Sequence, residues 1–225
     1  MIEPLVITID GPAGAGKSTV AQKLATRLGL TYVDSGATYR AAALKVLESG
    51  LDPLDEPAVA KLIATTEVRV TTGDGEQHVL VDGNDVTARL RTPEVTLAAA
   101  QVSRLPEVRA KLIEMQRTFA RGRGVVMEGR DIGTVVFPQA QLKIFLKADM
   151  VERARRRLKQ DSHDSSEATI EKTAYEIGRR DQLDSERKIS PLMPAADAVE
   201  IDSTNLLAEQ VVEQILVLAQ SRQLM

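Results

Sequence analysis

A glycine-rich segment, Gly11–Ser18, constrains the fold of this chain more than any other part of its sequence. It reads Gly-Pro-Ala-Gly-Ala-Gly-Lys-Ser and matches the pattern G-x-x-x-x-G-K-[ST], whose glycines let the backbone bend around phosphate groups. The apolar run Leu5–Asp10 precedes the segment, and apolar residues at helical spacing follow it from Lys17 to Leu28. This order of strand, loop and helix predicts the opening of a parallel α/β sheet.

The chemistry expected of such a loop is phosphate binding. Its backbone N–H groups and the positive end of the following helix dipole attract the anion. Lys17 is expected to reach the β- and γ-phosphates of a nucleoside triphosphate, and the Ser18 hydroxyl is the expected protein ligand of Mg²⁺. The triphosphate-binding residues predicted here are Gly11, Pro12, Ala13, Gly14, Ala15, Gly16, Lys17, Ser18 and Thr19.

The rest of the chain alternates between strand and helix patterns, with one interruption. Gly29 is expected to end the first helix, and a strand at 31–34 and a helix at 41–47 follow. The rhythm changes after Pro57, where short β-prone runs at 68–72 and 78–81 predict a hairpin within an insertion of about residues 63–100. Later strands are expected at 125–128, 142–146 and 198–202, and helices at 94–103, 108–120, 150–159, 170–184 and 206–219.

Composition excludes several classes of protein. The 225 residues contain no cysteine, which removes disulfides, thiolate metal sites and cysteine nucleophiles. A net charge of −3 provides no general attraction to nucleic acid or to a membrane, and no apolar run approaches the ~18 residues of a membrane span. The start of the chain lacks the features of a secretory signal. We therefore expect a monomeric cytoplasmic protein, with both histidines, His78 and His163, exposed.

A regulatory GTPase is an alternative that the loop alone does not exclude. Such a protein would carry an Asn-Lys-x-Asp motif that reads guanine after a late strand. The nearest match is Leu146-Lys147-Ala148-Asp149, in which a leucine replaces the amide. Because Leu146 has the position of the last core residue of its strand, we reject the GTPase interpretation.

Three further clusters are rich in groups that bind phosphate and a polar base. The first two follow predicted strands, so a parallel sheet would bring them to the same edge as the glycine-rich loop. In the third, Arg180, Asp184 and Arg187 are spaced as on one face of a helix, although a solvated, self-paired face would show the same spacing. The three clusters are Asp34–Arg40, Glu128–Thr134 and Arg179–Lys188.

Together these clusters resemble the bacterial cytidylate kinases, essentially from end to end. The resemblance is carried by the glycine-rich loop, by Gly129-Arg-Asp-Ile-Gly-Thr134, by Pro106-Glu-Val-Arg109, by Glu152–Arg157 and by Ser190–Asp197. It implies a P-loop α/β/α fold with a five-stranded parallel sheet, a small α+β insertion and a short lid. The implied parts are a core (about 1–34, 104–152 and 186–225), a CMP-binding region (about 35–103) and a lid (about 153–185), in which the polar segment 160–167 is the mobile part.

The same resemblance implies a reaction and a set of site residues. The reaction is transfer of the γ-phosphoryl group of ATP to CMP or dCMP with Mg²⁺, which demands charge neutralisation and positioning rather than a covalent intermediate. Arg153 and Arg157 correspond to positions that contact the ATP phosphates. The implied CMP-binding residues are Ser35, Arg40, Arg109, Arg130, Asp131, Arg180, Asp184 and Arg187, and the implied catalytic residues are Lys17, Arg130, Arg157 and Arg187.

Departures from the family pattern and two alternatives stay open. Ala100 stands where relatives often have a serine that contacts the base, Ala13 where some have serine and Glu128 where some have aspartate. A kinase for another nucleoside monophosphate would share most of the motifs. A P-loop regulatory protein with little turnover is the alternative from another class, although it would not need the acceptor-side arginines and Asp131.

The first prediction concerns Lys17, whose expected role is to neutralise phosphate charge rather than to pack. We expect Lys17→Ala to abolish phosphoryl transfer while the circular dichroism spectrum and melting temperature stay close to those of the wild type. Near-normal turnover in this variant would contradict the assignment of the loop.

Overall fold

The computed structural model describes residues 4–73, 76–160 and 166–224, which divide into two compact units. The first unit combines the chain up to Thr31 with the chain from Gly122 onward, and the second unit is Tyr32–Arg121. We describe each unit by itself. Among the helices of the described ranges, none is both long and apolar enough to cross a bilayer.

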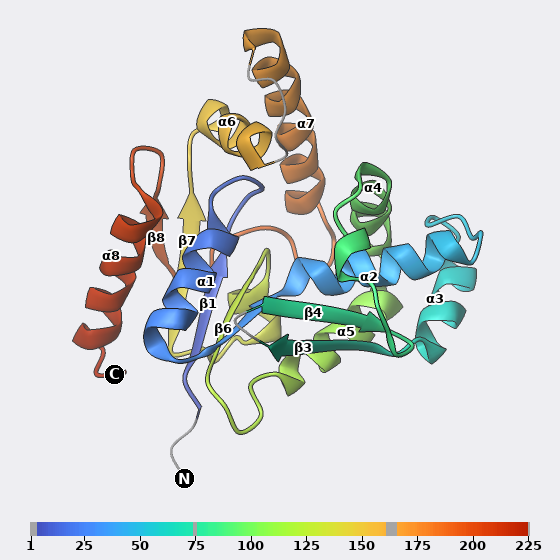
Figure 1. Ribbon diagram of the computed structural model, residues 1–225, viewed down its shortest axis with the longest axis horizontal. Helices are drawn as coiled ribbons and strands as arrows, with labels where there is room; N and C mark the ends of the chain where they lie inside the picture. The colour runs from blue at the N-terminus through green and yellow to red at the C-terminus, as the bar shows by residue number, and fades with distance from the viewer. Residues whose placement is uncertain (1–3, 74–75, 161–165, 225) are drawn as a thin grey trace. The chain divides into compact units, whose positions relative to one another are not determined.

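Strands β6, β1, β7 and β8 organise the first unit. They belong to a five-stranded sheet in the order β2-β6-β1-β7-β8 (Figure 1), whose edge strand β2 begins at the last residue of this unit's first segment. Neighbouring strands from β6 to β8 pair in parallel, as the sequence predicts. The register places Asp10, the last residue of β1, beside Gly129, the last residue of β6. Both loops that carry candidate site residues therefore begin at the same edge of the sheet. The strands are β1 (Val6–Asp10), β2 (Thr31–Asp34), β6 (Val125–Gly129), β7 (Leu142–Lys147) and β8 (Val199–Asp202).

The central strands form where apolar residues run without interruption. Every residue of β1 and of β6 is buried, which is typical of parallel strands that are covered on both faces. Leu146 in β7 is fully buried, in agreement with its expected place at the end of the strand core. The helices of this unit are α1 (Lys17–Leu28), α6 (Met150–Gln160), α7 (Glu167–Ser185) and α8 (Ala208–Ser221), with a short π-helical turn η2 (Ile132–Val136) after β6.

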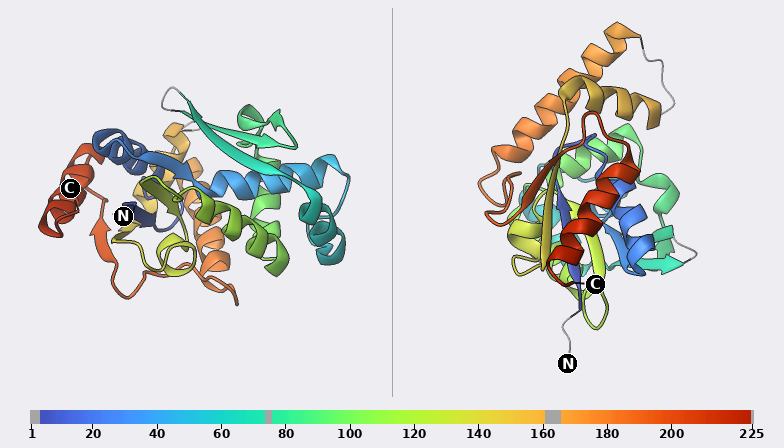
Figure 2. Two further views of the ribbon diagram at one scale, coloured as in Figure 1. Left: turned by 90° about the horizontal axis from the view of Figure 1, so that it is seen from below. Right: turned by 90° about the vertical axis from the view of Figure 1, so that its left-hand side faces the viewer.

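The helices of the first unit divide between the sheet and its carboxyl edge. α1 packs on β6 and against α8, and it ends at Gly29, whose φ of 64° confirms the predicted left-handed stop. α6 and α7 pack against each other beyond the end of β7 (Figures 1 and 2). Because the loop after β1 also begins at this edge, α6 and α7 are the helices available to contact it.

The second unit combines helices with a small antiparallel sheet. The predicted hairpin is formed by β3 (Val68–Gly73) and β4 (Glu76–Val81), and β5 (Asn84–Asp85) extends it. The tip, Asp74 and Gly75, lies outside the described residues. The apolar core of this unit gathers side chains from α2, α4 and α5 around Val59, Ile63 and Leu112. The helices are α2 (Ser35–Glu48), α3 (Glu56–Thr65), α4 (Pro93–Val102) and α5 (Pro106–Thr118), with a short turn η1 (Thr87–Arg89).

Helix α3 was not expected from the sequence. Pro57 suggested a break in the pattern, but it stands in the first turn of the helix, where a missing N–H is tolerated. The Asp55 side chain caps the same end by accepting a hydrogen bond from the Ala58 N–H at 3.2 Å. The change of rhythm after Pro57 thus marks the start of a helix that the sequence analysis did not predict.

The limits of the compact units differ from the expected parts at two places. The second unit extends to Arg121 because α5, which the sequence placed in the core, packs on α3 and α2. The expected lid segment 160–167 includes residues 161–165, which lie outside the described residues. His163 is among them, whereas His78 is partly exposed and its Nδ1 lies 3.0 Å from Asp85 Oδ2. The assignment of a CMP-binding region and of a lid to these parts stays a prediction.

Candidate active site

The glycine-rich loop after β1 has a backbone that only glycine permits at two positions. Gly11 has a φ of 147°, and a Cβ there would lie 2.0 Å from the backbone oxygen of Leu146. Gly14 has a φ of 75°, and a Cβ there would lie 2.8 Å from the backbone oxygen of Arg153. The loop is therefore packed closely against β7 and α6 of the same unit. Thr19, which was included among the expected ligand residues, is exposed in the first turn of α1.

Lys17 is buried under this loop. Its Nζ donates a hydrogen bond to the Pro12 carbonyl at 2.7 Å, so the side chain folds back across the loop. Burial lowers the pKa of Lys17 to about 7, and the positive charge of Arg130 acts in the same direction. The carboxylates of Glu128 and Asp181 act in the opposite direction. An anion such as a phosphate would supply the counter-charge that this amine lacks.

Ser18 and Glu128 place two oxygens side by side at the start of α1. The Ser18 hydroxyl donates to Glu128 Oε1 at 2.6 Å, and the Glu128 side chain is buried at the carboxyl end of β6. Hydroxyl and carboxylate oxygens are the kind of ligand that Mg²⁺ prefers. The donor set therefore fits the expected cation. In the sequence, Glu128 stood out only because some relatives have aspartate at this position. A carboxylate at the end of a strand next to a phosphate-binding loop could have indicated a contact with Ser18.

Asp10 holds the loop that follows β6. Its two carboxylate oxygens accept hydrogen bonds from the N–H groups of Ile132 at 2.8 Å and Gly133 at 2.7 Å, the first residues of η2. A Cβ on Gly133 would lie 2.8 Å from Thr8 Oγ1, so the turn fits closely against β1. Asp131, which immediately precedes η2, is also buried. Asp10, which the sequence analysis missed, thus positions a predicted base-reading residue.

Arg130, Asp184 and Arg187 form a buried ion-pair group. Asp184 Oδ2 accepts from Arg130 Nε at 3.0 Å, and Asp184 Oδ1 pairs with Arg187 Nη2. The expectation that Arg180, Asp184 and Arg187 share one helix face is wrong for Arg187, because α7 ends at Ser185. Arg180, by contrast, lies within α7 and is partly buried. One carboxylate therefore holds two of the predicted phosphate-binding guanidiniums in place.

Arg153 and Arg156 of α6 contact the glycine-rich loop. Arg153 Nη1 donates to the Ala13 carbonyl at 3.0 Å, and Arg156 Nη1 lies 3.4 Å from the Ala15 carbonyl. Arg156 Nη2 also donates to the Ser203 carbonyl after β8 at 2.7 Å. Arg157, which the resemblance placed at the ATP phosphates, is partly buried on the same helix. The sequence analysis did not identify Arg156, because the run Arg155-Arg-Arg157 provides no register.

The second unit carries the other predicted acceptor residues, Ser35, Arg40 and Arg109. Ser35 is buried in the first turn of α2, after the capping residue Asp34. Arg40 Nη2 pairs with Asp34 Oδ2 at 2.6 Å. Burial acts to raise the pKa of Asp34, but the charge and hydrogen bond of Arg40 keep that pKa below its usual value.

Arg109 is almost fully buried in the same unit, with 2% of its surface exposed. Its guanidinium carbon lies 5.4 Å from the centre of the Tyr39 ring, a cation–π distance. Its Nη1 donates to the Ser103 carbonyl at 3.2 Å, and the Ser103 hydroxyl donates to the Ala100 carbonyl at 3.1 Å. The Tyr39 ring and the Ser103 carbonyl therefore hold the Arg109 guanidinium in the interior of the second unit.

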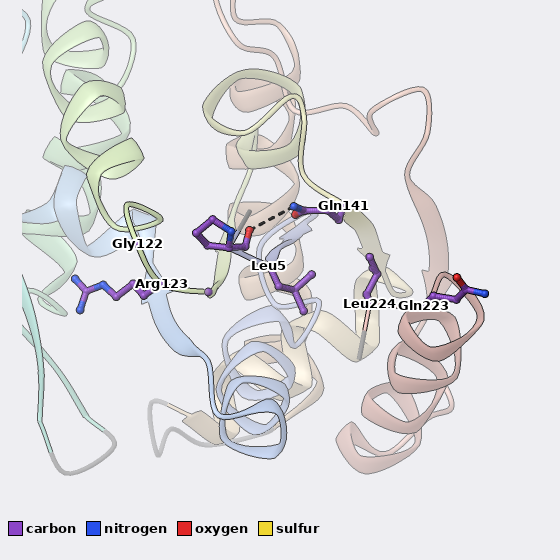
Figure 3. A pocket seen from close by; sticks show the side chains of 8 residues that line it. Leu5, Gly122, Arg123, Gln141, Gln223 and Leu224 are labelled. Carbon is purple, nitrogen blue, oxygen red and sulfur yellow. Dashed lines mark hydrogen bonds between the residues drawn. The ribbon is translucent and has the colours of Figure 1, made fainter. Parts of the chain in front are cut away.

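A pocket at the other edge of the sheet of the first unit is remote from these residues. It is lined by Leu5, Arg123, Gln141 and Leu224, among others, and so lies where β1, β6 and β7 begin (Figure 3). Gln141 Nε2 donates to the Pro4 carbonyl there at 3.3 Å. The loop residues of the first unit that are predicted to bind phosphate lie at the opposite edge, which is the edge where ligands bind in parallel sheets.

The fold and the glycine-rich loop define a P-loop α/β protein with a buried lysine, Lys17, and two buried arginines, Arg109 and Arg153. The family model described as "Cytidylate kinase" matches residues 7–221. A cytidylate kinase of Pelotomaculum thermopropionicum is 49% identical over 210 residues, which are 93% of each chain. One of Geobacillus kaustophilus is 49% identical over 216 residues, which are 96% of each chain. The chain therefore belongs to the cytidylate kinase family.

A solved structure supports the fold independently. It is an uncharacterized protein from Eubacterium ventriosum, with a TM-score of 0.52 and 11% sequence identity, and the match covers 96% of this chain and 99% of that one. At this identity the similarity concerns the fold alone. It agrees with the predicted α/β architecture.

The second prediction concerns Asp10, whose pKa burial raises to about 7 although two N–H donors act against that rise. The folded protein binds this proton more tightly than the unfolded chain, in which the pKa is 3.8. The stability contributed by Asp10 is thus fully present below the unfolded pKa and is lost as the pH rises through about 7.

We therefore expect the melting temperature of the wild type to fall relative to that of Asp10→Asn between pH 4 and pH 8. The expected relative change is on the order of 10 °C, since a rise of the pKa from 3.8 to about 7 corresponds to about 4 kcal/mol and each kcal/mol corresponds to about 2–4 °C in a chain of this size. Asp52→Asn is the control. Asp52 is exposed, and asparagine keeps the side-chain oxygen that accepts a hydrogen bond from the Leu54 N–H. A difference between wild type and Asp10→Asn that is constant with pH would contradict this account.

Proposed function

We propose that this chain is an ATP-dependent (d)CMP kinase, which transfers the γ-phosphoryl group of ATP to CMP or dCMP and yields ADP with CDP or dCDP. Membership of the cytidylate kinase family supports the acceptor. The single observation that carries the transfer chemistry is the buried Lys17 amine under a loop whose glycines fix the backbone. The reaction requires a site that gathers positive charge, and this site does so.

The donor phosphates would bind at the loop and at Lys17. Loop N–H groups and the start of α1 stabilise the β- and γ-phosphates, and Lys17 would exchange its bond to the Pro12 carbonyl for a phosphate oxygen. Charge that develops on the transferred group then meets donors that are already oriented. Such preorganised donors are the largest contribution to catalysis in many enzymes.

Ser18 would hold Mg²⁺ together with the donor phosphates. When bound, the cation supplies neutralisation of charge on the β- and γ-phosphate oxygens. Glu128 accepts a hydrogen bond from the Ser18 hydroxyl, so it fixes the orientation of that hydroxyl and leaves the lone pairs of its oxygen for a cation. The sequence predicted Ser18 alone as the protein ligand of Mg²⁺, and we propose that Glu128 assists it.

Arg130 and Arg187 would bind the phosphate of the acceptor. Asp184 holds both guanidiniums, and each of its oxygens retains a lone pair that could accept a ribose hydroxyl. Asp184 would thus orient two arginines and also contact the sugar. Two fixed guanidiniums suit the dianionic phosphate of a nucleoside monophosphate.

The base would be read by Asp131 and Arg109. Ser35 is a further acceptor-site position, and Arg40 would join Arg130 and Arg187 at the acceptor phosphate. Cytosine presents an N4 amino group that a carboxylate accepts, whereas uracil presents an oxygen at the same place. Ala100 has no side-chain donor or acceptor, so one hydrogen bond expected in relatives is missing. We further propose that the enzyme acts as a monomer in the cytoplasm, and that residues 153–185 close over the donor.

Two alternatives make different demands. A kinase for another nucleoside monophosphate would use the same donor site but a different base reader. A regulatory protein with little turnover would not need the Asp184 group, in which two arginines are held for an acceptor anion. Measurement of turnover with several acceptors therefore separates all three hypotheses.

The third prediction is the acceptor preference and its dependence on Asp131. With ATP and Mg²⁺, we expect kcat/KM for CMP and dCMP to exceed that for UMP by roughly ten- to fiftyfold, because an unpaired buried carboxylate costs about 1–3 kcal/mol or more. Asp131→Asn preserves the volume and offers an N–H to uracil O4, so the CMP to UMP ratio should approach one. A coupled assay of ADP release measures each value.

Asp52→Asn, at an exposed position, is the matched control and should leave the ratio unchanged. If Asp131→Asn lowers activity equally on CMP and UMP, Asp131 is a scaffold and the base is read elsewhere. Equal activity of the wild type on AMP and CMP would refute the proposed acceptor.

A further inference from the structure

Asp181 of α7 contacts the glycine-rich loop at a place where phosphate is expected. Its Oδ1 accepts a hydrogen bond from the Ala13 N–H at 3.0 Å, across 168 positions of sequence. Its Oδ2 pairs with Arg153 Nη1, and the side chains of Arg153 and Asp181 are 7% and 14% exposed. No motif pointed to Asp181, which the sequence places between the predicted ligands Arg180 and Asp184.

The groups around this carboxylate are those that would bind a phosphate oxygen. One is a loop N–H, one is a guanidinium, and Lys17 lies close enough for the Asp181 charge to act on its pKa. A carboxylate and a phosphate offer the same kind of anionic acceptor to such donors. The Ala13 N–H has one hydrogen, so Asp181 and a phosphate compete for it.

Arg153 needs a negatively charged partner when no nucleotide is bound, and the Asp181 carboxylate is that partner. The same Nη1 donates to the Ala13 carbonyl at 3.0 Å, so Asp181 and Arg153 together hold both polar groups of this residue. A buried guanidinium without a counter-charge destabilises a protein. Asp181 supplies that charge, and a phosphate in its place would supply it again.

We infer that Asp181 is a latch that occupies part of the phosphate-binding loop in the nucleotide-free enzyme and is displaced by the phosphates of ATP. Arg153 then exchanges a carboxylate for a phosphate and stays paired throughout. The hydrogen bond between α7 and the Ala13 N–H is broken in the same step. The apparent affinity for ATP is lowered by the fraction of molecules that are latched.

This inference rests on the proposed ATP site, and direct binding to the full chain tests it. MgATP is titrated calorimetrically, in the absence of CMP, into the wild type, Asp181→Asn and Glu176→Gln. Glu176 is exposed on the same helix, so its variant removes one negative charge without touching the loop. We expect Asp181→Asn to bind MgATP about five- to fiftyfold more tightly than the wild type, and Glu176→Gln to bind as the wild type does.

Amide hydrogen exchange separates a latch from a general effect of local charge. In the free protein, Asp181→Asn should exchange faster than the wild type in peptides from the second half of α7, whereas saturating MgATP should remove the difference. Unchanged or weaker MgATP binding by Asp181→Asn would overturn the latch and make Asp181 a structural clamp. In that case turnover on CMP by the wild type would leave the proposed function intact, whereas a wild type that binds no MgATP would contradict both.

Discussion

Burial of positive charge at the carboxyl edge of a parallel sheet is the constraint on which the rest of the first unit depends. Lys17 lies under the glycine-rich loop, whose backbone at position 11 permits no residue other than glycine. Burial lowers the pKa of the Lys17 amine to about 7. Buried charges are stable only when they are paired or hydrogen-bonded. Carboxylates therefore surround this edge, and each one fixes a part of the site.

Each carboxylate contacts a different part of the site. Asp10 holds the turn after β6, Glu128 orients Ser18, and Asp184 holds two arginines. Asp181, by contrast, takes a donor that a phosphate needs. The first three prepare the site for a ligand, and the fourth keeps it neutral until the ligand arrives. Transfer between two anions needs this balance, since charge must be neutralised in both the free and the bound enzyme.

Local patterns predicted most of the fold and the backbone of the glycine-rich loop. The glycine-rich loop, the stop at Gly29 and the strand ending near Leu146 depend on residues close in sequence, and the structure confirms them. Two misses have clear causes. Pro57 lies in the first turn of α3, a helix that was not predicted, and Arg187 lies beyond the end of α7. Contacts such as that of Asp181 with Ala13 join distant positions, so no periodicity reveals them. The acceptor residues came from resemblance, because spacing alone does not identify a base.

The central claim is that the loop with Lys17 passes a phosphoryl group to a cytidine monophosphate. The most direct measurement is the fate of radiolabel from the γ-phosphate of ATP, followed by thin-layer chromatography during a single incubation with Mg²⁺ and CMP. The account predicts that the label appears in CDP, in step with the loss of ATP, and that little inorganic phosphate forms. Label released as inorganic phosphate at the same rate with and without CMP would contradict it.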